Sequence, residues 1–270
     1  MEFRLPERIE ISNKSTYGRV LNIAGSDYMP GAAYLSSVSA LKVGCGYCFL
    51  ATSKKVISTV AAKSSNIVFV DPKNIIKAMQ TADVIEIGCG LSTNYSGKKV
   101  FNKFIKYAPS QTPIIVDADG LNLISEKNAE FIKRKFQKVI FTPHPLEAAR
   151  LLNTDSVLDN IAGAAKLISE KYNCITVLKT HNTFIYSPDG RSYTNTTGNS
   201  SMAKAGSGDV LTGMIAGLVA QGMGLFEAAA LAVHLHGLCG DIAKEKLTEY
   251  SVMAEDLISS IHLAINSYLK

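Results

Sequence analysis

Short runs of β-branched and apolar residues alternate with helical patterns along most of this 270-residue chain. The apolar runs lie at residues 20–24, 47–51, 84–87, 114–116, 139–141 and 175–178. Helical patterns lie at about 31–43, 95–107, from 121, from 145, and at 157–172. Such alternation is typical of parallel strands that are joined by crossover helices. The pattern therefore predicts an α/β fold, with a mostly parallel central sheet and helices on both faces.

The last third of the chain departs from this alternation. Residues 184–186 and 192–194 flank a Pro188-Asp189-Gly190 turn and predict a hairpin added to the sheet. Three helical patterns then close the chain. Because no Pro/Ser/Gly-rich linker divides the sequence, we expect one domain over residues 1–270.

Composition and charge exclude several classes of protein. Hydrophobic residues make up 47% of the chain and charged ones 19%, which argues against disorder. The charged amino terminus is no secretory signal and no long apolar run predicts a membrane span, so we expect a cytoplasmic protein. A net charge of +5 with scattered basic residues does not favour nucleic-acid binding. Five cysteines suggest reduced thiols, and Cys45 and Cys48 are interpreted as buried thiols rather than a redox or zinc pair.

Polar or glycine-rich segments follow five of the predicted strands. They are Gly25-Ser26-Asp27, Gly88-Cys89-Gly90, Asp117-Ala118-Asp119-Gly120, Thr142-Pro143-His144-Pro145 and Lys179-Thr180-His181-Asn182-Thr183. In an open parallel sheet, ligands bind beyond the carboxyl ends of the strands. These five exits are therefore expected to share one edge and to line the site.

The segment from Gly206 to Asp209 precedes a strongly apolar helical pattern. Gly206, Ser207 and Gly208 would let backbone N–H groups approach an anion, and the start of a helix adds positive potential there. Asp209 would lie in the first helical turn. A carboxylate beside phosphate is unhelpful for binding it, so Asp209 is a candidate base that takes a proton from an attacking hydroxyl. The alternative is that Asp209 only complements the helix dipole.

Three other residue groups leave alternatives open. His144 lies between two prolines and either caps the next helix or presents its imidazole to a ligand. Asp117 and Asp119 could bind a divalent ion, although a helix cap or a ribose hydrogen bond is favoured. Lys179 ends a strand, where it could meet phosphate or remain an exposed lysine.

Several of these motifs together resemble one family. They are, in order, Ala24-Gly25-Ser26, Pro30-Gly31-Ala32-Ala33, Ile87-Gly88-Cys89-Gly90, Asp117-Ala118-Asp119-Gly120, Thr142-Pro143-His144-Pro145, Thr197-Gly198-Asn199 and Gly206-Ser207-Gly208-Asp209. Over nearly its whole length the chain resembles the ADP-dependent NAD(P)H-hydrate dehydratases. The resemblance implies a ribokinase-like three-layer sandwich.

The resemblance also implies a reaction, the repair of hydrated NADH and NADPH. Asp209 would take a proton from the 6-hydroxyl as that hydroxyl attacks the terminal phosphate of ADP, with Mg²⁺ bridging the phosphates. Phosphate then leaves, and the reduced cofactor is regenerated together with AMP and phosphate. The sequence leaves open ADP against ATP as donor, and NADH hydrate against NADPH hydrate as substrate.

The family's site residues can be placed on this sequence by the same resemblance. Ala32 or Ala33, Gly90, His144 and Asp209 would contact the hydrated cofactor. The nucleotide would be held by Lys179, Thr180, His181, Asn182, Thr183 and Gly208. The anion hole would be formed by Ala205, Gly206, Ser207 and Gly208. No residue is assigned to the metal.

The chain departs from the family pattern at four positions. The family usually has glycine where Thr180, Ala205 and Ser92 stand, and proline at Cys89. Related two-domain enzymes carry an epimerase domain, for which this chain has no room, so a separate epimerase would act on the same substrate. Family similarity also implies a homo-oligomer, a tetramer.

Two other functions use the same residues. A small-molecule kinase of this fold, acting on a hydroxyalkyl heterocycle, would share the loop that ends in Asp209. The His144 segment and the Gly31-Ala32-Ala33 turn favour the dehydratase. A non-catalytic nucleotide sensor is disfavoured, because a sensor needs no base beside the phosphate.

Overall fold

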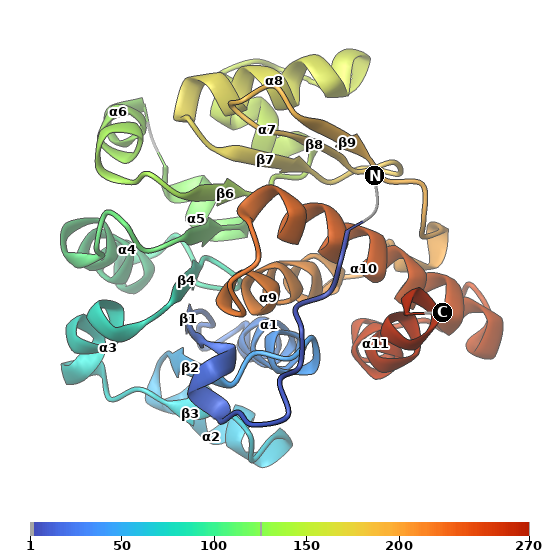
Figure 1. Ribbon diagram of the computed structural model, residues 1–270. Helices are drawn as coiled ribbons and strands as arrows, with labels where there is room; N and C mark the ends of the chain where they lie inside the picture. Colours follow the sequence, from blue (N-terminus) through green and yellow to red (C-terminus); the bar gives the residue numbers. More distant parts are fainter. Residues whose placement is uncertain (1–2, 125, 270) are drawn as a thin grey trace.

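A nine-stranded sheet forms the centre of the computed structural model, which describes residues 3–124 and 126–269 (Figure 1). The strands are β1 Arg19–Ile23, β2 Tyr47–Ala51, β3 Val68–Phe69, β4 Val84–Ile87, β5 Ile114–Val116, β6 Val139–Phe141, β7 Ile175–Leu178, β8 Phe184–Tyr186 and β9 Ser192–Thr194. Their order is β3-β2-β1-β4-β5-β6-β7-β8-β9. Strands β1 to β7 pair in parallel, and β8 and β9 form the antiparallel hairpin. The predicted mostly parallel sheet is confirmed.

Helices cover both faces of this sheet. They are α1 Pro30–Lys42, α2 Lys54–Lys63, α3 Ile75–Thr81, α4 Tyr95–Tyr107, α5 Ala118–Leu123, α6 Glu126–Lys135, α7 Pro145–Leu152, α8 Ile161–Tyr172, α9 Ser207–Ala220, α10 Leu225–Leu247 and α11 Ala254–Tyr268. Short 3-10 segments lie at Lys14–Tyr17, Pro72–Asn74, Leu158–Asn160 and Ser200–Met202. Figure 1 shows α3, α4 and α6 on one side and α1, α9, α10 and α11 on the other.

Side chains alternate between two cores along each strand, as a period of two requires. On β4, Val84 packs into the core under α9, α10 and α11, whereas Ile85 and Ile87 pack into the core under α3, α4 and α8. Glu86 lies between those two isoleucines and therefore faces the α1 and α9 layer. A carboxyl group in the middle of a buried strand is the exception in this pattern.

Helices α1 and α9 approach each other unusually closely. A Cβ atom at Gly213 would lie 2.0 Å from the carbonyl oxygen of Ser36, and one at Gly217 would lie 2.5 Å from that of Ala40. Only glycine fits at such contacts. The small residues of α9 thus allow the helix to seat against α1 and the sheet, which fixes the position of its first turn.

The structure adds elements that the sequence pattern did not reveal. Strand β3 has only two residues and Val68 is 41% exposed, so it leaves no apolar run to detect. Helix α2 follows a serine cap, in which the Ser53 hydroxyl accepts a hydrogen bond from the amide of Val56. The helix expected from residue 121 begins earlier, at Ala118, and ends before α6. Residues 158–160, expected to be helical, form a 3-10 turn.

Helix α10 is long and apolar enough to cross a membrane by length and composition alone. However, 67% of its most apolar window is buried, against α9 and α11 among other elements. Its apolar character therefore reflects its position in the core.

Candidate functional site

The carboxyl ends of β1 and β4 meet at the point where the strand order reverses. From β1 the chain winds outward to β2 and β3, and β4 pairs with the other edge of β1. The amide of Gly25, after β1, donates a hydrogen bond to the carbonyl of Cys89, after β4, at 2.8 Å. Such a switch point is where open α/β sheets bind ligands.

Residues 205–208, which the sequence predicts to form the anion hole, are called the anion loop below. This loop enters α9 through a left-handed residue. Gly206 has φ +93°, and a Cβ there would lie 2.5 Å from Leu35 Cδ1 and 3.0 Å from Ala254 Cβ. The first helical hydrogen bond at this end is donated by Val210 to the carbonyl of Gly206. The Ser207 amide donates to the carbonyl of Lys204 at 3.3 Å, so the amides of Gly208 and Asp209 are the donors that this helix start offers to an anion.

Asp209 lies in the first turn of α9, as the sequence predicts. Burial raises the pKa of its carboxyl group to about 6, and the negative charge of Asp117 acts in the same direction. A hydrogen bond with the Cys89 thiol partly opposes this rise. The carboxylate remains ionised near neutral pH and is a stronger base than an exposed aspartate, which suits a proton acceptor.

Lys179, at the end of β7, forms a buried ion pair with Asp117. Its Nζ lies 2.6 Å from Asp117 Oδ1, and the Thr212 hydroxyl donates to Asp117 Oδ2 at 2.7 Å. Burial alone would lower the pKa of Lys179, but Asp117 and Glu147 outweigh it and raise that pKa. A Cβ at Gly208 would lie 3.2 Å from Lys179 Nζ. The lysine charge thus lies directly against the anion loop.

The segment after Lys179 forms a tight polar turn. The Thr180 hydroxyl donates to the carbonyl of Asn182, and the Thr183 hydroxyl to that of Thr180. The side chains of His181 and Asn182 are exposed, whereas Thr183 is buried. The predicted nucleotide-binding residues are therefore contiguous with Lys179 and the anion loop, and Ala205 is exposed at the start of that loop.

Two of the predicted cofactor-binding residues are in contact. Gly90 has φ +60°, and a Cβ there would lie 2.7 Å from the Cβ of Ala32. Ala32 is half-buried, but Ala33 is completely buried and packs against Gly25. Of the two alanines between which the sequence left the choice open, only Ala32 offers a surface to a ligand.

His144 caps α7, which was one of its two interpretations. Its Nδ1 accepts hydrogen bonds from the amides of Leu146 and Glu147, and Glu147 bonds back to the amide of His144. The other ring nitrogen, Nε2, lies 3.3 Å from Glu147 Oε1, and 43% of the side chain is exposed. Burial raises the pKa of Glu147 to about 7. The cap holds the imidazole at a fixed angle, half in solvent.

Asp119 does not cap the helix that follows. It lies inside α5, and its Oδ2 accepts a hydrogen bond from the amide of Ser92 at 2.8 Å. Ser92 has φ +70°, a left-handed conformation that favours glycine. The Asp119 bond holds this unfavourable residue in the turn after β4.

Two residues at this edge were not identified from the sequence. Glu86 is completely buried, its Oε1 lies 3.6 Å from Cys89 Sγ, and burial raises its pKa to about 8. His236 of α10 places its Nε2 3.4 Å from the Ser207 hydroxyl, behind the anion loop. Glu86 could have been identified from the sequence, because it is the only charged residue within an otherwise apolar strand. For His236, which was interpreted as a core or surface residue, core burial is correct.

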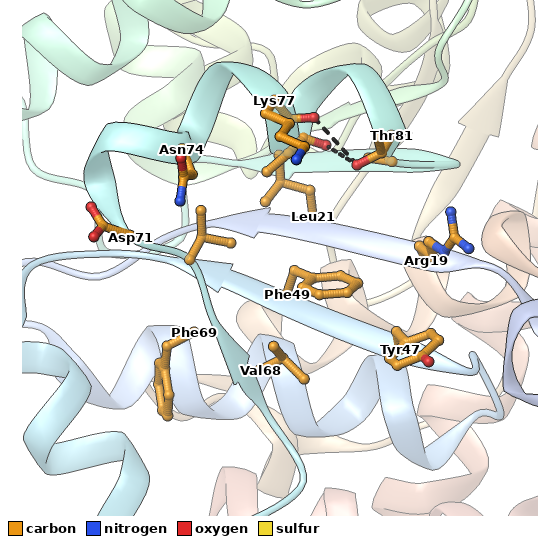
Figure 2. Close-up of a pocket in the computed structure, with 13 residues that line it drawn as sticks. Arg19, Leu21, Tyr47, Phe49, Val68, Phe69, Asp71, Asn74, Lys77 and Thr81 are labelled. Atoms are coloured by element: carbon orange, nitrogen blue, oxygen red, sulfur yellow. Dashed lines mark hydrogen bonds between the residues drawn. The ribbon is translucent and has the colours of Figure 1, made fainter.

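A separate hollow of about 470 Å³ lies away from these residues, between α3 and strands β1 to β3 (Figure 2). Figure 2 shows Leu21, Phe49 and Val68 facing it from the sheet, with Lys77 and Thr81 on the helix. It opens on the α3 face, opposite to the layer that carries Asp209. None of the predicted site residues lines it, so it is not part of the candidate site.

Comparison with known proteins assigns the chain to one family. The sequence profile of the NAD(P)H-hydrate dehydratase family matches residues 20–263. A bifunctional NAD(P)H-hydrate repair enzyme of Moorella thermoacetica is 36% identical over 94% of this chain. The chain spans about half the length of that relative, 50%.

Solved structures agree with the fold. A ribokinase-like superfamily protein of Enterococcus faecalis superposes with a TM-score of 0.89 at 29% identity, over 98% of this chain and 92% of that one. An ADP/ATP-dependent NAD(P)H-hydrate dehydratase of Bacillus subtilis, co-crystallised with ATP and Mg²⁺, superposes with a TM-score of 0.85 at 32% identity, over 98% and 94% of the two chains. The predicted ribokinase-like fold is confirmed.

Proposed function

Because this chain belongs to the NAD(P)H-hydrate dehydratase family, we propose that it repairs hydrated NADH and NADPH by ADP-dependent dehydration. One observation supports the chemistry most directly. The carboxyl group of Asp209 lies in the first turn of α9, directly after the anion loop, with its pKa raised to about 6. A proton acceptor and a phosphate-binding loop are thereby placed side by side.

The first step transfers a phosphoryl group. Asp209 takes the proton of the 6-hydroxyl as its oxygen attacks the terminal phosphate of ADP, and AMP leaves. Backbone N–H groups from Ala205 to Gly208 donate to the oxygens that gain charge. The nitrogen lone pair of the ring then expels phosphate, and the C5 proton leaves to give the reduced nicotinamide. The protein thus converts a poor leaving group, hydroxide, into a good one.

The two substrates divide the edge of the sheet between them. The nucleotide lies along residues 179–183 and Gly208, where Lys179 supplies positive charge. The hydrated cofactor contacts Ala32, Gly90, His144 and Asp209, and Ala33 supports this surface from below. The boundary between them is Asp209, where the hydroxyl and the phosphate meet.

The proposal includes Mg²⁺, and the donors at this edge fit it. Mg²⁺ is usually held by one or two carboxylates together with phosphate oxygens and water. The half-buried Asp119 presents a carboxylate here, and its charge contributes to the raised pKa of Asp209. Asp119 would hold the ion together with phosphate oxygens and water, whereas the two oxygens of the neighbouring Asp117 already bond to Lys179 and Thr212. When bound, the ion would neutralise charge on the phosphates.

Three wider features belong to the proposal and rest on family resemblance. The protein works in the cytoplasm, it assembles as a homo-tetramer, and a separate epimerase acts on the same substrate. The bifunctional relative, of which this chain spans 50%, supports the link to a second repair activity.

The proposal is tested by incubating the purified protein with chemically hydrated NADH, Mg²⁺ and either ADP or ATP. We expect the absorbance of the reduced nicotinamide to recover with ADP, with release of AMP and phosphate. Recovery with neither nucleotide would contradict the proposal. ATP-dependent phosphorylation of a hydroxyalkyl heterocycle without such recovery would instead indicate the kinase.

Replacing the base gives a first prediction. Asp209→Asn keeps the shape of the side chain but cannot accept the proton, so we expect kcat to fall by about 10²–10⁴-fold. Calorimetric titration with ADP should show binding within a few-fold of wild type, because the amides and Lys179 are unchanged. A variant rate close to that of wild type would remove Asp209 from the mechanism.

A further inference from the structure

Cys89, Asp117 and Asp209 bring a thiol and two carboxylates together beside the proposed base. One ligand atom from each lies within 4.8 Å of the other two. Among the side chains of residues 3–124 and 130–269, this is the only group of three metal-ligating residues so close together. We propose that this cluster binds a thiophilic divalent cation of the zinc class, and that the bound cation blocks Asp209.

The distances in the cluster are close to those of a coordinated ion. Bonds of about 2.3 Å to sulfur and about 2.0 Å to oxygen at tetrahedral angles separate the two ligand atoms by about 3.5 Å. Cys89 Sγ lies 3.9 Å from Asp117 Oδ2 and 3.6 Å from Glu86 Oε1. Small side-chain movements are therefore enough to close a coordination sphere around the sulfur.

The buried carboxyl group of Glu86 is a second observation that points to a cation at this cluster. The residue is completely buried, and its Oε2 has no hydrogen-bond partner among the described residues. An unpartnered polar atom in a buried site is costly. Its other oxygen lies 3.6 Å from Cys89 Sγ, so Glu86 borders the group of three, and a shift of its side chain would be needed for it to act as a fourth ligand.

The charges of the cluster also favour a cation. Four acidic groups, Glu86, Cys89, Asp117 and Asp209, share one nearby lysine. Lys179 bonds to Oδ1 of Asp117, whereas Oδ2 faces Cys89 and accepts a hydrogen bond from the Thr212 hydroxyl. Burial raises the pKa of the Cys89 thiol well above its usual range, and the charges of Asp209, Glu86 and Asp117 add to that rise. A metal ion that binds to the Cys89 sulfur must displace the thiol proton.

The ligand types select the class of ion. Thiolate prefers zinc-class cations, whereas Mg²⁺ prefers oxygen donors alone. The family usually has proline where Cys89 stands, and proline offers no ligand. Asp209 is half-buried at the mouth of the site, which gives an ion a route of entry. We therefore expect Cys89 to bind zinc-class ions in this chain, at a position where proline could not bind them.

The binding test uses Cd²⁺, because its bond to thiolate absorbs in the ultraviolet. The full-length reduced protein is titrated without nucleotide. We expect one Cd²⁺ per chain, a thiolate-to-metal band that survives excess Mg²⁺, and no such band in Cys89→Ser. The matched control is Cys48→Ser, another fully buried free cysteine, which should keep the band. No band in wild type, or a band that Cys89→Ser keeps and Cys48→Ser loses, would overturn the proposal.

The inhibition test rests on the proposed function, whereas the Cd²⁺ titration does not. With hydrated NADH, ADP and excess Mg²⁺, Zn²⁺ should inhibit wild type, and Cys89→Pro should raise the inhibition constant by about tenfold or more. Thermal unfolding of each variant shows whether it is folded. An inhibition constant unchanged in a folded variant would refute the blocking of Asp209. If wild type shows no repair activity, the proposed function fails, and the Cd²⁺ titration still decides the metal site.

Discussion

Gly206 and Gly190 have nearly the same φ angle but very different surroundings. Their φ angles are +93° and +91°. A Cβ at Gly206 would meet Leu35 and Ala254, whereas a Cβ at Gly190 would meet nothing within 4 Å. Substitutions at these two positions therefore distinguish the cost of a left-handed backbone from the cost of the contacts around the anion loop.

We expect Gly190→Ala to lower the free energy of unfolding by about 1 kcal/mol, the cost of a left-handed alanine. Gly206→Ala should lower it by a further 1–3 kcal/mol or so, because the added methyl group overpacks the loop against α1 and α11. Urea unfolding measures both. Gly206→Ala should also weaken ADP binding, while Gly190→Ala should not. Equal effects of the two variants would mean that the contacts of Gly206 do not matter.

At single residues, local chemistry could be predicted from sequence and contacts across the fold could not. The position of Asp209 in a helical turn and the capping role of His144 follow from their immediate neighbours. The burial of the cysteines was predicted as well. That Cys89 lies against Asp117 and Asp209 depends on how β4, β5 and α9 meet, and no spacing in the sequence encodes that distance.

Helix α10 supports the anion loop from behind through His236. This imidazole is only 8% exposed, and burial lowers its pKa to about 4. A hydrogen bond to the Ser207 backbone opposes this shift, and the charge of Lys179 adds to it. The neutral ring is therefore part of the folded structure at neutral pH. Protonation would place a charge in the core beneath Ser207.

The buried neutral His236 should make the folded protein less stable in acid. Between pH 6.5 and about 4 the unfolded chain binds a proton at His236 that the folded chain does not, so the free energy of unfolding falls as the pH is lowered through this window. The loss attributable to this residue is on the order of 3 kcal/mol. His236→Gln should lose less stability than wild type between pH 7.5 and pH 4, as measured by urea unfolding. Parallel pH curves for the two proteins would contradict this role.

Among the elements, buried apolar runs decided what the sequence could predict. Even the three-residue strands β5 and β6 were identified, because all of their residues are apolar and buried. Strand β3 was missed because it has two residues, of which Val68 is 41% exposed, and the 3-10 turn at 158–160 was interpreted as helix. The start of α5 was misplaced because Ala118 enters the helix with φ +45°, which no preference of alanine would suggest.

At the scale of the whole molecule, the two ends of the described chain are joined. The Tyr268 hydroxyl of α11 accepts a hydrogen bond from the amide of Phe3 at 3.1 Å and donates to the carbonyl of the same residue. The Phe3 ring packs edge-on against Tyr193 of β9, with centroids 5.6 Å apart. The first residues therefore connect the edge hairpin to the last helix.

Phe3→Ala should lower the free energy of unfolding by about 3 kcal/mol, because a ring that is 7% exposed is removed from the core. The control is Ile11→Ala in the same segment, whose side chain is 95% exposed. It should change stability by less than about 0.5 kcal/mol. Urea unfolding of the two variants compares them, and a similar loss in both would show that Phe3 does not anchor the segment.

The close fit of α9 against α1 also constrains how the molecule is made. Helix α1 and strands β1 and β4 leave the ribosome long before the glycines of α9 that seat on them. Until then, the face of β4 that carries Glu86 is open to water, where its carboxyl group is readily hydrated. Folding of the central sheet is thus completed late in synthesis, and an interrupted chain that ends before Ser207 lacks both the phosphate loop and the cover of its most deeply buried acid.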